Sequence, residues 1–323
     1  VTGNPVTQGQ VPFGEVWLRD YWGIDKMASA ASHKSFRPLT SITFRWNFQH
    51  SVAAYGELQS FGFHVVNVAM HAVVSMLCLP ASLLAFGNYE RKDQAAFFTA
   101  VLFAVHPVHS EAVQNITGRA EVLMSLFFIL GFISYASFVQ HLRSTPAGAS
   151  LLPTLRTLLA IALAMGFTLC SLLSKEMGAT LPLLCAFWDF FAIAGLSLKD
   201  LVPGLVVLRS GNGKEARCRS WLLRTGILAV LTLALFKWRI SLNGNHTPYF
   251  RYNSNRHAIE PLRPGNVSPQ LVVGEDTGVH GMYRWLSIMW VWCHYLGTAL
   301  VPSTLSPDWS GASIPLVETI SDP

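Results

Sequence analysis

The stretch from residue 94 to residue 138 reads "QAAFFTAVLFAVHPVHSEAVQNITGRAEVLMSLFFILGFISYASF" and holds a polar segment between two apolar runs. A helix needs roughly 20 mainly apolar residues to cross the hydrocarbon core of a bilayer. The run after Glu121 approaches that length, whereas the run before His106 is shorter. The stretch therefore predicts a membrane-spanning helix that is preceded by a polar segment at the membrane surface.

The composition of the whole chain indicates the same class of protein. The chain has 323 residues, of which 51% are hydrophobic and only 13% are charged, and its mean hydropathy is +0.37. Soluble domains carry about 25% charged residues. We therefore predict an all-α polytopic membrane protein whose loops carry short amphipathic helices. The expected spans lie near residues 60–86, 120–140, 157–173, 177–197, 221–242 and 283–302, with a shorter one near 94–107.

The distribution of Lys and Arg predicts which loops share a side of the membrane. If all these spans cross, the loops near 87–93, 142–156 and 198–220 lie on one side and hold nine basic residues. The loops near 106–119, 174–176 and 243–281 hold five. Because basic residues are retained on the cytoplasmic side, the second set, together with residues 1–58, is expected to be luminal. Two sequons on that side make Asn245 and Asn266 candidates for N-glycosylation.

Several classes of function are not indicated by the sequence. The formal net charge of +5 mostly reflects the cytoplasmic loops, and no basic patch interleaved with aromatic residues predicts nucleic-acid binding. The five cysteines contain no CxxC pair, so they predict neither a disulfide framework nor a zinc site. We expect no metal and no cofactor.

Polar residues inside an expected span mark a candidate site, because they are costly there. His64, Asn67 and His71 recur at i, i+3 and i+7, which places them on one face of a helix. That face either forms hydrogen bonds between helices or lines a donor site.

The polar segment itself permits two interpretations. The spacing of His106, His109 and Glu111 could suit a metal. However, Pro107 interrupts the segment, and the sequence offers no additional ligand nearby that would anchor the ion. The alternative is a capped helix that begins at Ser110.

In the capped helix, Glu111 lies in the first turn, where a carboxylate interacts favourably with the helix dipole. Glu111, Asn115 and Arg119 would then form one polar stripe.

Further charged residues lie beside the expected spans. Lys175 and Glu176 separate two apolar runs and are either an interfacial pair or, for Lys175, a cation suited to a phosphate oxygen. Upstream, His33, Lys34 and Arg37 alternate with aromatic residues, as in a segment that lies among lipid headgroups.

Six motifs carry a resemblance to a known family. They are "RDYWG" (19–23), "SHKSFRPLTSITFRWNF" (32–48), "FHVVNVAMH" (63–71), "AVHPVHSEAVQNITGRAEVL" (104–123), "SLLSKEMGATLPL" (171–183) and "VPSTLSPDWSGASIPL" (301–316). Taken in this order, the chain resembles the transmembrane O-mannosyltransferases that target cadherins, over nearly its whole length.

The resemblance implies a GT-C glycosyltransferase of the endoplasmic reticulum membrane. Such an enzyme transfers mannose from dolichyl phosphate mannose to Ser or Thr of a secretory-pathway protein, such as a cadherin, with inversion at the anomeric carbon. It also implies that a first transmembrane helix, an acidic pair and C-terminal tetratricopeptide repeats lie outside this chain. The main catalytic base is then expected upstream of Val1.

In this chemistry a carboxylate takes the proton of the acceptor hydroxyl, and cations stabilise the departing phosphate. We expect Asp20 and then Glu111 as assisting carboxylates. The donor phosphate is expected to contact Lys175, Arg119, Lys34 and Arg37. The residues expected to shape the site are His33, His64, Asn67, His71, His106, His109, Glu121 and Glu176. A membrane transporter or channel and a non-catalytic scaffold remain the alternatives.

The expected organisation has four parts. Residues 1–58 form a luminal loop with interfacial segments, 59–242 a transmembrane bundle, and 243–281 a second luminal loop. Residues 282–323 add a further membrane or interfacial helix and a luminal segment.

Overall fold

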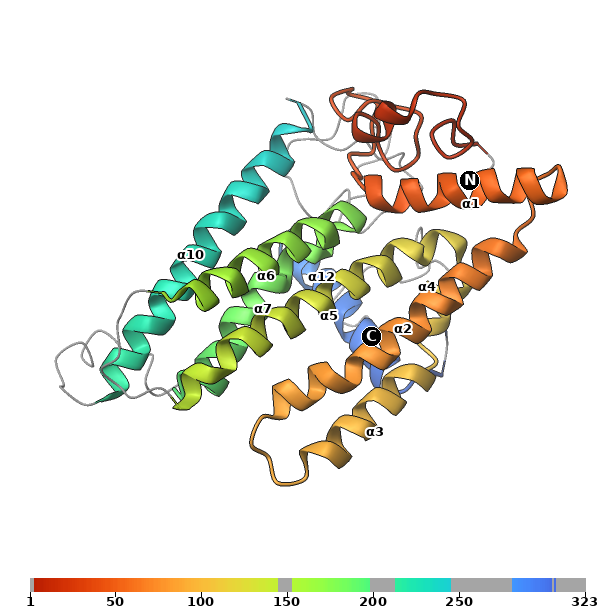
Figure 1. Ribbon diagram of the computed structural model, residues 1–323. Coiled ribbons are helices and arrows are strands. Elements are labelled where there is room, and N and C mark those ends of the chain that lie inside the picture. Colours follow the sequence, from red (N-terminus) through yellow and green to blue (C-terminus); the bar gives the residue numbers. More distant parts are fainter. Residues whose placement is uncertain (1–2, 145–152, 198–212, 245–280, 304, 306–323) are drawn as a thin grey trace.

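The computed structural model describes residues 3–144, 153–197, 213–244, 281–303 and 305 (Figure 1). Within these ranges the chain is helical, and the only β-structure is an isolated bridge between Arg19 and Lys26. The prediction of an all-α protein is confirmed. The α-helices are α1 (Pro38–Tyr55), α2 (Phe61–Phe86), α3 (Lys92–Val105), α4 (His109–Gln114), α5 (Arg119–Val139), α6 (Leu155–Ser174), α7 (Leu181–Trp188), α10 (Gly213–Ser241) and α12 (Gly281–Leu300).

Five segments of the described chain are long and apolar enough to cross a membrane, so this is a multi-pass membrane protein. They are Phe61–Phe86, Ile116–Leu142, Leu155–Ser174, Glu176–Ile193 and Ala216–Ser241, which match five of the expected spans. The other two expected spans, near 94–107 and 283–302, correspond to α3 and α12. Both are helices but are not among the five. With only 14 residues, α3 forms a hairpin with α2 (Figure 1).

The core of the bundle lies between α5, α6 and α7. Tyr135, Ala160, Ala164 and Leu181 are completely buried there. Large apolar side chains elsewhere on the helices are exposed, among them Met76, Phe98, Leu183 and Leu233. An apolar exterior around a packed core suits a bundle that is surrounded by lipid.

A buried ion pair joins α10 to the end of the fourth span. Asp189 starts a π-helical turn, η5 (Asp189–Ile193), and accepts two hydrogen bonds of 2.7 Å from Arg224 on α10. The Tyr135 hydroxyl donates a third bond of 2.7 Å to the same carboxylate. Such pairing offsets the cost of placing a charge within the membrane.

The N-terminal segment and α1 lie over one end of the bundle, at an angle to the spans (Figure 1). Helix α1 begins at Pro38, which suits a first helical position, and ends at Gly56, whose φ of 74° gives the left-handed cap. The Thr40 hydroxyl donates to the Ser174 carbonyl at 2.9 Å, and the Lys34 ammonium donates to the Asn243 carbonyl at 2.9 Å. The described parts of the loops that the charge pattern assigned to one side, residues 3–58, 106–119, 174–176 and 243–244, therefore lie at one end of the bundle.

Candidate functional site

A cavity of about 570 Å³ lies at this end, between the N-terminal segment and helices α2 to α5. Six of the residues singled out in the sequence line it, namely Arg37, His71, His109, Glu111, Asn115 and Glu121. Tyr21, Trp22, Phe103, Thr117 and Ser125 complete much of the wall. We call this space the rim cavity.

One side of the rim cavity carries two ion pairs. Arg37 donates to the Glu176 carboxylate at 2.8 Å and 3.1 Å, and Lys175 pairs with Glu121. Arg37 and Glu121 line the cavity itself, so Lys175 and Glu176 are linked to it through their partners. The arrangement places two cations and two carboxylates where the spans end.

The pKa of Lys175 is sensitive to this environment. Burial and, to a smaller extent, the Arg37 cation lower the pKa to about 8, against the opposing effect of Glu176. Glu121, in contact with the ammonium, favours the charged form. Lys175 is therefore a cation at neutral pH that loses its proton in the mildly alkaline range.

The opposite wall contains histidines in an aromatic setting. The His109 ring lies 4.2 Å from the Phe103 ring and 5.2 Å from the His71 ring, measured between centroids. Burial lowers the pKa of His109 to about 4, and His71 and His106 add to the effect. His109 is therefore neutral at physiological pH. In the described part of the chain, no group of three or more His, Cys, Asp or Glu side chains could hold a metal ion.

The polar segment does not form the single capped helix expected from the sequence. Helix α4 starts at His109 rather than after a Ser110 cap, and it ends at Gln114. The Asn115 side chain then accepts from the Thr117 amide at 3.0 Å, which starts the short helix η2 (Ile116–Gly118). The predicted Ser110 cap and the predicted continuous stripe are wrong, because the chain turns between α4 and α5.

Gly118 permits this turn. A Cβ atom at Gly118 would lie 2.4 Å from the Ala112 carbonyl oxygen, so only glycine allows η2 to approach α4 this closely. The turn places Glu111 at the rim cavity and directs Arg119 elsewhere.

Arg119 is a completely buried connection between three helices. Its guanidinium donates to the Asn67 side chain at 2.7 Å, the Asn47 side chain at 2.6 Å and the Phe63 carbonyl at 2.9 Å. It also lies 4.6 Å from the Phe44 ring centroid. This position does not fit the phosphate contact expected from the sequence, because the side chain is 0% exposed and points into the α1–α2 interface.

Asp20 and Lys34 stabilise the loop that precedes α1. The Asp20 carboxylate is 5% exposed and accepts from Ser32 Oγ at 2.9 Å and from the His33 amide at 3.3 Å. The Lys34 ammonium donates to the carbonyls of Met27, Ser29 and Asn243, which uses all three of its protons. Neither position fits a direct contact with substrate.

Three of the remaining expected residues have structural contacts. Asn67 is fully buried and donates to the Val113 and Asn115 carbonyls, each at 3.3 Å, as the interhelical interpretation requires. His106 Nδ1 accepts from the Val108 amide at 3.3 Å. His33 Nδ1 lies 2.7 Å from Ser35 Oγ, and its pKa is lowered by burial and by Arg37.

Three other expected positions have no place in the rim cavity as described. His64 on α2 is half-buried and is not among the residues that line the rim cavity. The glycosylation candidates Asn245 and Asn266 lie outside the described residues.

Comparisons with known proteins identify relatives along the whole chain. The family model described as "Protein O-mannosyl-transferase TMTC, DUF1736" matches residues 278–323. The human protein O-mannosyl-transferase TMTC4 is 32% identical over 341 residues, which is 100% of this chain and 41% of the relative. The chain belongs to the TMTC family. Human TMTC3 is 31% identical and human TMTC1 is 32% identical, each over 100% of this chain.

This TMTC chain spans 41% of the length of TMTC4 and 31% of the length of TMTC3. No solved structure matches it significantly.

The structure adds two residues of the TMTC chain that sequence reasoning missed. The Tyr21 hydroxyl donates to the Thr117 carbonyl at 3.1 Å, and burial raises the pKa of Tyr21 to about 12, so it stays protonated. Arg239 at the end of α10 donates to the Lys34 carbonyl at 2.6 Å and lies 4.0 Å from Glu176. The motif "RDYWG" was a usable signal for Tyr21. Arg239 has no such signal, because Lys34 and Glu176 are remote from it in sequence.

Proposed function

We propose that this chain is the membrane part of a protein O-mannosyltransferase. In this proposal the full-length protein transfers mannose from dolichyl phosphate mannose to Ser or Thr of a secretory-pathway protein, with a cadherin-like acceptor as the leading class. The enzyme resides in the endoplasmic reticulum membrane, with the rim cavity on the luminal side. The names of the TMTC relatives support the type of reaction.

The observation that carries the proposal is the combination of charges at the rim cavity. Arg37 lines the cavity, and Lys175 contacts the cavity residue Glu121. Two cations that each pair with a carboxylate can reorganise around a phosphate, because charge-assisted hydrogen bonds to phosphate are strong. The membrane end of the spans is also where the sugar phosphate of a lipid-linked donor must lie.

The reaction is a single displacement. The acceptor oxygen forms a bond to the anomeric carbon as the bond between that carbon and the phosphate oxygen breaks, and dolichyl phosphate leaves. Glu111, on the cavity wall, is positioned to assist removal of the proton from the acceptor hydroxyl. Arg37 and Lys175 stabilise the charge that develops on the phosphate.

The experiment is mannosyl transfer from labelled dolichyl phosphate mannose to an acceptor peptide by the full-length protein. Replacing Lys175 with Ala should raise the KM for the donor by roughly tenfold to a hundredfold, because a hydrogen bond to a charged group is lost. The matched control is Lys26→Ala, since Lys26 is exposed in the same rim region and does not line the cavity. An unchanged KM in Lys175→Ala contradicts the assigned role, and a wild type that transfers no mannose contradicts the function.

A further inference from the structure

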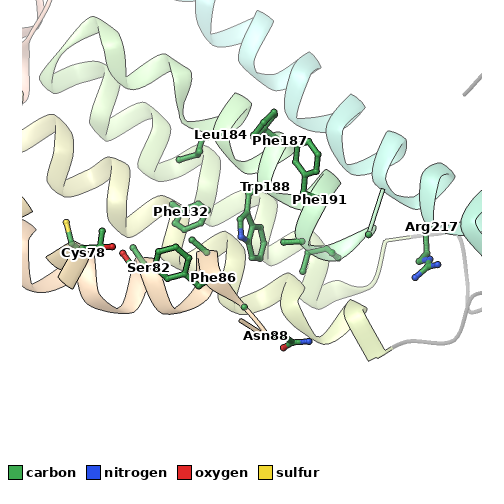
Figure 2. Close-up of a pocket in the computed structure, with 17 residues that line it drawn as sticks. Cys78, Ser82, Phe86, Asn88, Phe132, Leu184, Phe187, Trp188, Phe191 and Arg217 are labelled. Atoms are coloured by element: carbon green, nitrogen blue, oxygen red, sulfur yellow. The ribbon is translucent and has the colours of Figure 1, made fainter. Parts of the chain in front are cut away.

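A second cavity, of about 780 Å³, lies at the opposite end of the bundle (Figure 2). It is formed by the end of α2, by α3, α5 and α7 with η5, and by the start of α10. Its volume falls in the range of about 300–1,000 Å³ that is typical of ligand pockets. We call it the distal cavity.

The interior of the distal cavity is apolar and largely aromatic. Phe132, Leu184, Phe187, Trp188 and Phe191 contribute to its wall, and their side chains lie together in the middle of the site (Figure 2). Phe132 and Trp188 pack edge to face, with centroids 5.6 Å apart. A hydrocarbon chain suits such a wall, because it has no polar groups of its own that would need hydrogen-bond partners there.

The polar residues lie at the edge of the distal cavity. Asn88 and Arg217 are both exposed, and Figure 2 shows them away from the Cys78 end of the site. A guanidinium nitrogen of Arg217 lies 3.9 Å from the place where a Cβ atom of Gly195 would be, so the cation lies close to the cavity wall. Within the described residues, Arg217 has no ion-pair partner.

The loops at this end of the bundle carry an excess of positive charge. Their described parts, residues 87–93, 142–144, 153–156 and 213–220, hold seven Lys and Arg residues against three Asp and Glu residues. Basic residues at a membrane surface attract anionic lipids, and basic pockets between transmembrane helices bind their headgroups. The charge of the region and the single cation at the cavity edge thus point to the same type of ligand.

We propose that the distal cavity binds an anionic phospholipid of the bilayer. One acyl chain occupies the aromatic interior, and the phosphate of the headgroup contacts Arg217. This site lies at the other end of the spans from the rim cavity and does not depend on the mannosyltransferase proposal.

Lipid retention by the full-length protein tests this site. The protein is reconstituted in equal amounts of dioleoylphosphatidylcholine and dioleoylphosphatidylserine, extracted in mild detergent, and its bound lipid is measured by native mass spectrometry. Wild type should retain phosphatidylserine in preference to phosphatidylcholine. Arg217→Gln should lower that retention by about fivefold, as expected for the loss of one cation near an anionic lipid. The control Arg219→Gln removes the same charge from an exposed residue that does not line the cavity, and it should retain the wild-type amount.

A second variant tests the acyl-chain part of the site. Ala85 is exposed and lines the distal cavity, so Ala85→Trp fills it without entering the packed core. This variant should retain little of either lipid. Full retention by Ala85→Trp, equal losses in the two arginine variants, or extraction of a polyprenyl phosphate instead of a phospholipid from native membranes would each overturn the proposal.

Discussion

Lys175 illustrates how a single charge is held at a membrane surface. It follows the last residue of α6, where a cation interacts favourably with the carbonyl end of the helix. Burial and Arg37 disfavour the charge, while the contact with Glu121 favours it. The balance leaves an ammonium group that is charged at neutral pH and can still lose its proton.

This balance predicts a pH dependence of donor binding. Because the pKa of Lys175 is lowered to about 8, the cation is present below that pH and disappears as the pH rises through it. The KM for dolichyl phosphate mannose should therefore increase between pH 7 and pH 9. Arginine keeps its charge throughout this range, so Lys175→Arg should flatten the increase, which steady-state kinetics over a pH series can measure. Identical pH profiles for wild type and Lys175→Arg would contradict this assignment.

Only some of the residues that the sequence placed together line the rim cavity. Arg37, Glu111 and Glu121 line the rim cavity, because residue type and sidedness were enough to bring them to one end. Asp20 is at the same end but forms hydrogen bonds within its own loop, and Lys34 donates to that loop and to the Asn243 carbonyl. The direction of a side chain depends on backbone turns and remote partners, which a single sequence does not contain.

At the scale of elements, the turn from α4 to α5 decides what the polar segment does. Ser110 had the chemistry of a cap, yet the N-cap of α4 is Val108, two residues earlier, and the helix ends at Gln114. The spans were predictable because apolar length is a strong local signal. Short helices at the surface were not, because close contacts such as that of Gly118 with Ala112 determine them.

Arg119 at the start of α5 should contribute mainly to stability. Its guanidinium joins α5 to Asn47 on α1 and Asn67 on α2, and its loss leaves several buried groups without a partner. We expect Arg119→Met to lower the free energy of unfolding by about 3–5 kcal/mol. Thermal or denaturant unfolding in detergent measures this, with Arg91→Met as the control at an exposed position. A variant of wild-type stability with a raised KM for the donor would instead favour the phosphate role.

At the scale of the whole molecule, the two ends of the bundle differ in chemistry. One end holds paired charges around the rim cavity, and the other holds the distal cavity with Arg217 at its edge. Within the membrane, Asp189 is satisfied by Arg224 and Tyr135. Such saturated pairing gives little support to a transport path, which would require polar groups that can exchange partners.

The sidedness of the bundle can be tested with single cysteines. Ile24 is 64% exposed at the rim end, and Asn88 is exposed at the distal end. In sealed microsomes, a membrane-impermeant maleimide should label Asn88→Cys directly and Ile24→Cys only after permeabilisation, in a background without the native cysteines. The reverse pattern would place the rim cavity on the cytoplasmic side and contradict the proposed orientation.

The most direct test of the central claim, that the rim cavity is the place of mannosyl transfer, is the kcat of Glu111→Gln in the full-length protein. With labelled dolichyl phosphate mannose and an acceptor peptide, we expect kcat to fall by about a hundredfold, in the range of general-base contributions, while the donor KM changes little. Glu15→Gln is the matched control, because Glu15 pairs with Arg19 and does not line the cavity. A Glu111→Gln enzyme with the kcat of wild type would contradict the account.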